Sequence, residues 1–166
     1  MTDDPLNRGR HETPAERLDR NWDELLQELR VVQTGVQILG GFLLILPFQQ
    51  RFTEIEAVNR RVYLLAFCLT MVATVFLVAP VASHRLLFHK REKGTLVAIA
   101  NVCARIGLVA LALAVTSVAF IIFDVLTGTG AAIAAAGAVL LLFLVNWLLL
   151  PLGVLRRDRA SDGGHA

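Results

Sequence analysis

Apolar residues recur along residues 13–48 in alternating steps of four and three, which keeps them on one face of a helix. They are Leu18, Trp22, Leu25, Leu29, Val32, Val36, Leu39 and Leu43. The start is marked by Thr13 as N-cap, Pro14 at the first helical position and Glu16 as the reciprocal partner of a capping box. The pattern therefore predicts one helix from Pro14 to about Leu46, charged at its start and apolar at its end.

Such a helix is near 50 Å long at about 1.5 Å per residue, whereas a hydrocarbon core is about 30 Å thick. Its first turns should therefore project into the cytosol. That part carries five acids and two arginines: Glu16, Arg17, Asp19, Arg20, Asp23, Glu24 and Glu28. A helix lying on a membrane surface is typically basic. We therefore expect this one to dock on protein through a docking seam of Leu18, Trp22, Leu25 and Leu29.

Three further apolar runs follow, and together they predict an all-α polytopic membrane protein in which four transmembrane helices form a bundle. Hydrophobic residues make up 55% of the chain, and the mean hydropathy is +0.61. The expected organisation has a disordered cytoplasmic tail, an amphipathic cytoplasmic helix, a transmembrane domain and a second cytoplasmic tail. These parts take residues 1–12, 13–30, 31–152 and 153–166, and the spans take about 31–48, 62–81, 101–123 and 131–150.

Local signals refine the later helices. Residues 53–56 read as a second capping box, Tyr63 as an interfacial aromatic and Pro80 as a kink or an end. Small residues in the third span should let neighbouring helices approach closely. They are Ala100, Ala104, Gly107, Ala110 and Ala114.

Lys and Arg are distributed unequally between the two sides of the predicted membrane. The segment through Arg30 has five, the middle loop has four and the C-terminal tail has three, against three and none in the opposite connections. The positive-inside rule then predicts a multi-pass plasma-membrane protein with both termini cytoplasmic. The middle basic loop contains His84, Arg85, Lys90, Arg91 and Lys93. We expect it to neutralise the acidic projection of the first helix, with histidine pH sensing as a remote alternative.

Polar residues inside the spans are the candidate site. They are Gln33, Thr34 and Gln37 in the first span, with Arg30 at its cytoplasmic entrance, and Asn101 and Arg105 in the third. Polar side chains are costly in lipid, so they should face the bundle interior, either as interhelical hydrogen bonds or as a polar pathway. Arg105 is either a snorkelling anchor or a buried cation paired with the first helix. Asp124 is an acid at the outer edge of the third span.

Other chemistry has little support in the sequence. Cys68 and Cys103 lack CxxC spacing and a histidine set, so we expect buried free thiols, with no metal and no cofactor. No nucleophile–base pair and no paired intramembrane carboxylates occur, so we do not expect an enzyme. The basic residues follow topology without interleaved aromatics, which argues against nucleic-acid binding.

Several strings resemble a family of small actinobacterial four-helix membrane proteins of unknown function. The most specific are ETPAERLDRNW at residues 12–22, ELLQELRV at 24–31 and QTGVQIL at 33–39, followed by FLL at 42–44, LPF at 46–48, AP at 79–80 and HRLLF at 84–88. The resemblance covers residues 12–151. It implies a bacterial inner-membrane protein, and similar members sometimes carry an automatic sodium–proton antiporter label that identifies no site residues.

Two functions are consistent with these patterns. The first is a structural or oligomeric membrane subunit that docks on a second copy or another protein through the N-terminal helix. The alternative is a transporter, with cation–proton exchange as one form. Proton-coupled transport usually needs an ionisable residue at depth, and no Asp or Glu lies in the middle of a span. An oligomer could still build a pore from Gln33, Thr34 and Gln37.

Overall fold

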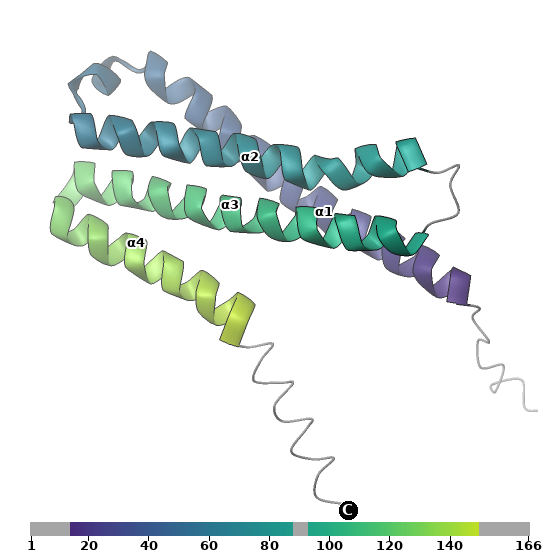
Figure 1. The fold of residues 1–166 in the computed structure, drawn as a ribbon. Helices are drawn as coiled ribbons and strands as arrows, with labels where there is room; N and C mark the ends of the chain where they lie inside the picture. The colour runs from purple at the N-terminus through teal and green to yellow at the C-terminus, as the bar shows by residue number, and fades with distance from the viewer. Residues whose placement is uncertain (1–13, 88–92, 150–166) are drawn as a thin grey trace, which may run out of the picture.

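Four long helices make up the fold in the computed structural model, which describes residues 14–87 and 93–149 (Figure 1). They are α1 Pro14–Ile45, α2 Ala57–Leu87, α3 Lys93–Thr127 and α4 Thr129–Leu144. The 3₁₀ turns η1 Leu46–Phe48 and η2 Gln50–Glu54 join α1 to α2, and the π turn η3 Val145–Leu149 follows α4. All four helices are long and apolar enough to cross a membrane, over Leu26–Phe48, Ala57–Ala82, Ile99–Thr127 and Thr129–Trp147. The predicted all-α class is confirmed.

The helices form an open arrangement rather than a closed bundle. Helices α2 and α3 run side by side along their length, and α1 crosses them obliquely (Figure 1). In the described part of the chain α4 packs only against α3, and its far end diverges from the other helices. Only 6% of the α4 span is buried, against 28% for the α2 span. The predicted four-helix fold is therefore an open one, in which α3 is the neighbour that α4 packs against.

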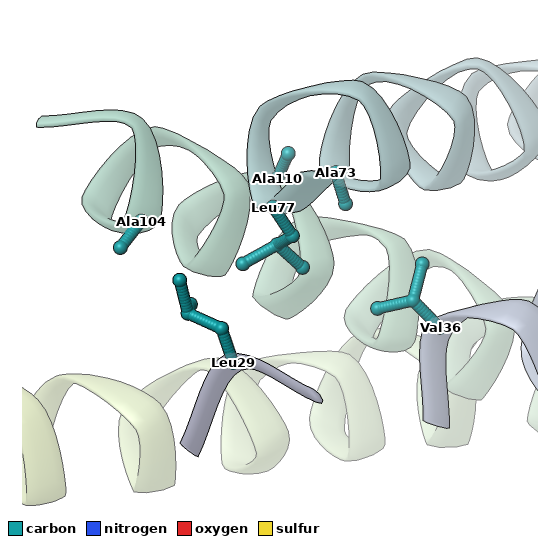
Figure 2. Packing of buried hydrophobic residues seen from close by; sticks show 6 residues of the cluster. All are labelled: Leu29, Val36, Ala73, Leu77, Ala104 and Ala110. Atoms are coloured by element: carbon teal, nitrogen blue, oxygen red, sulfur yellow. The ribbon is translucent and has the colours of Figure 1, made fainter. Parts of the chain in front are cut away.

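The membrane half of the four–three seam packs on the chain's own helices. Leu29, Val36 and Leu43 are 5%, 1% and 2% exposed. Figure 2 shows Leu29 and Val36 pointing from α1 towards a cluster with Ala73, Leu77, Ala104 and Ala110. Leu43 packs in a second cluster with Tyr63 and Ala66. The predicted helical periodicity thus selects the face of α1 that contacts α2 and α3.

Small residues allow α2 and α3 to approach as closely as predicted. Gly107 lies at a close approach of the two helices, because a Cβ built there would lie 2.7 Å from Leu77 Cγ and 3.4 Å from the Ala73 carbonyl oxygen. Real Cβ atoms are not found that near to another heavy atom, so only glycine fits without movement. The four neighbouring alanines that the sequence pointed to are also buried: Ala100, Ala104, Ala110 and Ala114.

A hydrogen bond from another helix replaces the one that Pro47 cannot make. Pro47 has no N–H for the carbonyl of Leu43, four residues earlier, and the Tyr63 hydroxyl donates to that carbonyl at 2.9 Å. Carbonyls freed by proline in a membrane helix need such partners. Helix α2 continues through Pro80, and Gln33 Nε2 donates at 2.6 Å to the carbonyl of Leu77 in the turn before it.

Some local expectations are wrong. Helix α2 begins at Ala57, and the Thr53 hydroxyl donates back to the Gln50 carbonyl within η2, so residues 53–56 do not cap the helix. Tyr63 is 6% exposed, and its ring centroid lies 4.9 Å from that of Phe52, so its side chain is buried between helices; its place at the membrane interface stays a prediction. Cys68 is a free thiol as expected, but it is exposed.

A single residue separates α3 from α4. Gly128 has φ of 100°, a region that side chains rarely adopt, and its N–H donates to the carbonyls of Phe123 and Asp124. This tight reversal holds α4 against α3 and places Asp124 in the last turn of α3.

Candidate functional site

One side of α1 carries polar and small residues that its own chain leaves uncovered. We call Arg30, Thr34, Gln37 and Gly41 the polar face of α1; all four are exposed, and their steps of four, three and four place them in one stripe. Gln37 is the middle residue of the span Leu26–Phe48. The Thr34 hydroxyl donates to the Arg30 carbonyl at 3.0 Å.

The expectation that this stripe faces the interior is wrong for the single chain. A helix packed on one side of two neighbours has one inner face, and Leu29, Val36 and Leu43 occupy it. Gln33 differs from the rest because its side chain is partly buried and reaches the Leu77 carbonyl. Interhelical hydrogen bonding is therefore confirmed for Gln33, while the remaining members are not gathered into an internal pathway.

The two predicted polar residues in the first half of α3 also lie outside. Asn101 and Arg105 are exposed, one turn apart. Arg105 lines an open cavity of about 360 Å³ with Leu69, Ile106 and Val109. This placement agrees with a snorkelling side chain, and the alternative of a buried cation paired with α1 is wrong.

A polar pair joins α2 to α3 at the end of the molecule where η2 lies. Asn59 Nδ2 donates to Asp124 Oδ2 at 2.6 Å, and Asn59 is 2% exposed. Asn59 Oδ1 and Asp124 Oδ1 are buried, and neither has a hydrogen-bond partner within the described part of the chain. Both residues line a cavity of about 400 Å³, together with Arg51, Ile55 and Val125 and the carboxylates of Glu54 and Glu56.

The sequence pointed to Asp124 and missed Asn59. The available signal was topological: a hairpin of neighbouring spans brings the start of the second span beside the end of the third. Asn59, in the first turn of α2, and Asp124, in the last turn of α3, are the polar residues that this juxtaposition brings together.

The docking seam is only partly described. Leu29 is covered by α2 and α3, so it is not available to another molecule, and that part of the prediction is wrong. The side chains of Leu18, Trp22 and Leu25 lie outside the described ones, although the backbone of α1 is helical there. In the basic loop, Lys90 and Arg91 lie outside the described residues, as do the side chains of His84, Arg85 and Lys93. Both predicted tails, 1–12 and 153–166, also lie outside them.

Four membrane-length helices in the described part of the chain define an all-α polytopic membrane protein. Residues 11–151 match the model described as "Family of unknown function (DUF6328)", and the chain belongs to that family. This agrees with the resemblance to a membrane-protein family of unknown function. Comparisons with curated proteins and with solved structures find no match.

Proposed function

We propose that the protein is an oligomeric subunit of the bacterial plasma membrane, in which a second copy covers the polar face of α1. The observation that supports this is the exposure of Gln37 at the centre of a span, on a side of α1 that the chain's own helices leave open. Both termini lie in the cytoplasm in this proposal, since the basic residues cluster on their side.

The energetic argument begins with the amide of Gln37. Transferring an amide into a medium without hydrogen-bond partners costs about 4–8 kcal/mol on hydrocarbon scales and about 1–3 kcal/mol from protein data. A hydrogen bond between membrane helices returns about 0.6–2 kcal/mol. The amide contains both donor and acceptor, so two Gln37 side chains related by a two-fold axis can pair with each other.

The neighbours of Gln37 favour the same interface. Gly41 lies one turn away with no atom within 4 Å of a Cβ built there, which leaves room for the backbone of a partner helix. Thr34 already bonds to its own backbone, so its exposure costs less than that of Gln37. The cytoplasmic segment of α1, residues 14–25, would extend the contact beyond the membrane through Leu18, Trp22 and Leu25.

Disulfide cross-linking tests this interface. In a background carrying Cys68→Ala and Cys103→Ala, Gln37→Cys should give a covalent dimer in oxidised membranes. Phe42→Cys is the matched control, because Phe42 is 68% exposed in the same span but lies about 7.5 Å along the helix and about 140° around it from Gln37. Equal cross-linking at both positions, or none at position 37, would contradict the proposal.

Cation–proton exchange remains the alternative and has less support. Within the described spans, acids occur near the ends, at Glu28 and Asp124, and Gln33 is already bonded to Leu77. A pH-gradient dye assay in proteoliposomes tests it directly. Sodium- or potassium-dependent loss of the gradient that disappears in Gln37→Leu or Asp124→Asn would favour exchange, and a flat trace from inserted protein would exclude it under those conditions.

A further inference from the structure

The Asn59–Asp124 pair contains two buried acceptor atoms that lack a hydrogen-bond donor within the described part of the chain. The Asn59 amide nitrogen is used in the bond to Asp124 Oδ2, and both buried atoms without a partner are oxygens. Turning the Asn59 amide by 180° would place its oxygen against the carboxylate, so reversal does not remove the deficit. The pair therefore needs a hydrogen-bond donor or a positive charge.

The cavity beside the pair is suited to a positively charged occupant. Its lining residues include three acids, Glu54, Glu56 and Asp124, and one base, Arg51. Arg51 forms no ion pair with an acid among the residues that the structure describes, so it does not neutralise Asp124 directly. A volume of about 400 Å³ leaves space for an ion that keeps several of its water ligands.

We propose that this cavity binds one alkali cation, coordinated by Asn59 Oδ1 and Asp124 Oδ1 after a small rotation of the two side chains, because both oxygens are shielded from solvent as they stand. A single carboxylate at the pair matches a single positive charge. Calcium takes six to eight oxygen ligands, several of them from carboxylates, whereas only one carboxylate belongs to the pair. In the described residues no group of three or more His, Cys, Asp or Glu side chains could hold a metal ion together. Glu54 and Glu56 then contribute through their field and through bound water rather than as direct ligands.

Binding there would join three parts of the chain. Asn59 belongs to the first turn of α2, Asp124 to the last turn of α3, and the remaining charged residues to η2 and the connection after it. An ion between them would hold this end of the α2–α3 pair closed. The site is separate from the polar face of α1, so cation binding and self-association can fail independently.

The test uses the full chain in nanodiscs of phosphatidylcholine, with NaCl or KCl exchanged for N-methyl-D-glucamine chloride at constant ionic strength. We expect a saturable rise in the unfolding temperature of the wild type and of Glu28→Gln, which removes an acid far from the cavity. Asp124→Asn keeps an acceptor for Asn59 Nδ2 but removes the charge, so its apparent affinity should fall at least tenfold. No saturable effect in the wild type, unchanged affinity in Asp124→Asn, or tighter binding of CaCl₂ than of NaCl would overturn the proposal.

Hydrogen exchange of the wild type gives a measurement that needs no variant. Sodium should slow exchange at residues 57–60 and 123–128 more than in the middle of α2 and α3. Uniform slowing, or none, would contradict binding at this place. The Gln37→Cys cross-link should form equally with and without sodium.

Discussion

Gly107→Ala tests the close packing of α2 on α3. The added methyl would lie 2.7 Å from Leu77 Cγ and 3.0 Å from Leu77 Cδ2, and Leu77 is fully buried, so the side chain or one of the two helices must shift. Overpacking of this kind costs about 1–3 kcal/mol, while the helix propensity of alanine returns about 1 kcal/mol. The free energy of unfolding should therefore change little or fall by up to about 2 kcal/mol.

Gly137→Ala is the matched control, because nothing lies within 4 Å of a Cβ at that position in α4. It should gain the propensity term alone, so the two variants should differ by about 1–3 kcal/mol in free energy of unfolding. Adding Leu77→Ala to Gly107→Ala removes the clashing atoms, and the double-mutant cycle should show a favourable coupling of about 0.5–3 kcal/mol.

The assay measures the free energy of reversible unfolding of the full chain in bicelles, with the unfolded fraction detected by trapping the unfolded state. Helix association in lipid depends on packing rather than on exclusion of water, so this contact should matter to the whole fold. Equal stabilisation by Gly107→Ala and Gly137→Ala would refute the close approach of α2 and α3 at this residue.

Three other variants separate the remaining features. Tyr63→Phe keeps the ring contact with Phe52 but leaves the Leu43 carbonyl unpaired, so unfolding in bicelles should show a loss of about 1–3 kcal/mol; an unchanged stability would exclude that bond. Gln33→Leu should lower the same stability by about 0.5–1.5 kcal/mol and leave cross-linking through position 37 intact, and weakened cross-linking would show that Gln33 belongs to the oligomer interface. Arg51→Gln removes a positive charge from the lining of the cavity beside Asn59 and Asp124, so sodium should bind more tightly by about 1 kcal/mol in the nanodisc titration. Weaker binding would contradict this and show that the Arg51 side chain helps to hold the site together.

The helices and the inner face of α1 could be predicted because both follow from short-range periodicity. Leu29, Val36 and Leu43 repeat every seven residues, and a helix of that pattern buries them together wherever its neighbours lie. The predicted capping box at residues 53–56 is wrong because the chain forms a 3₁₀ turn there. The Thr53 hydroxyl donates to a carbonyl within that turn instead of capping α2.

The candidate sites needed tertiary information. Both the apolar four–three seam and the polar stripe of α1 were predicted to face the other helices, and periodicity alone does not decide between them. In the structure α1 packs on α2 and α3 through the seam, so Val36 is buried and Gln37 is exposed. Asn59 and Asp124 are 65 positions apart in the sequence, so no local sequence pattern predicts their hydrogen bond. The role of Gln33 likewise depends on the turn before Pro80 in another helix.

The central claim is that a second copy covers the polar face of α1. Its most direct measurement is the stoichiometry of the labelled full chain in liposomes, counted by single-molecule photobleaching over a series of protein-to-lipid ratios. We expect dimers for the wild type, and about a 5- to 30-fold weaker association for Gln37→Leu if the lost amide pair is worth about 1–2 kcal/mol. A wild type that stays monomeric across the series, or a Gln37→Leu variant that associates equally well, would contradict the claim.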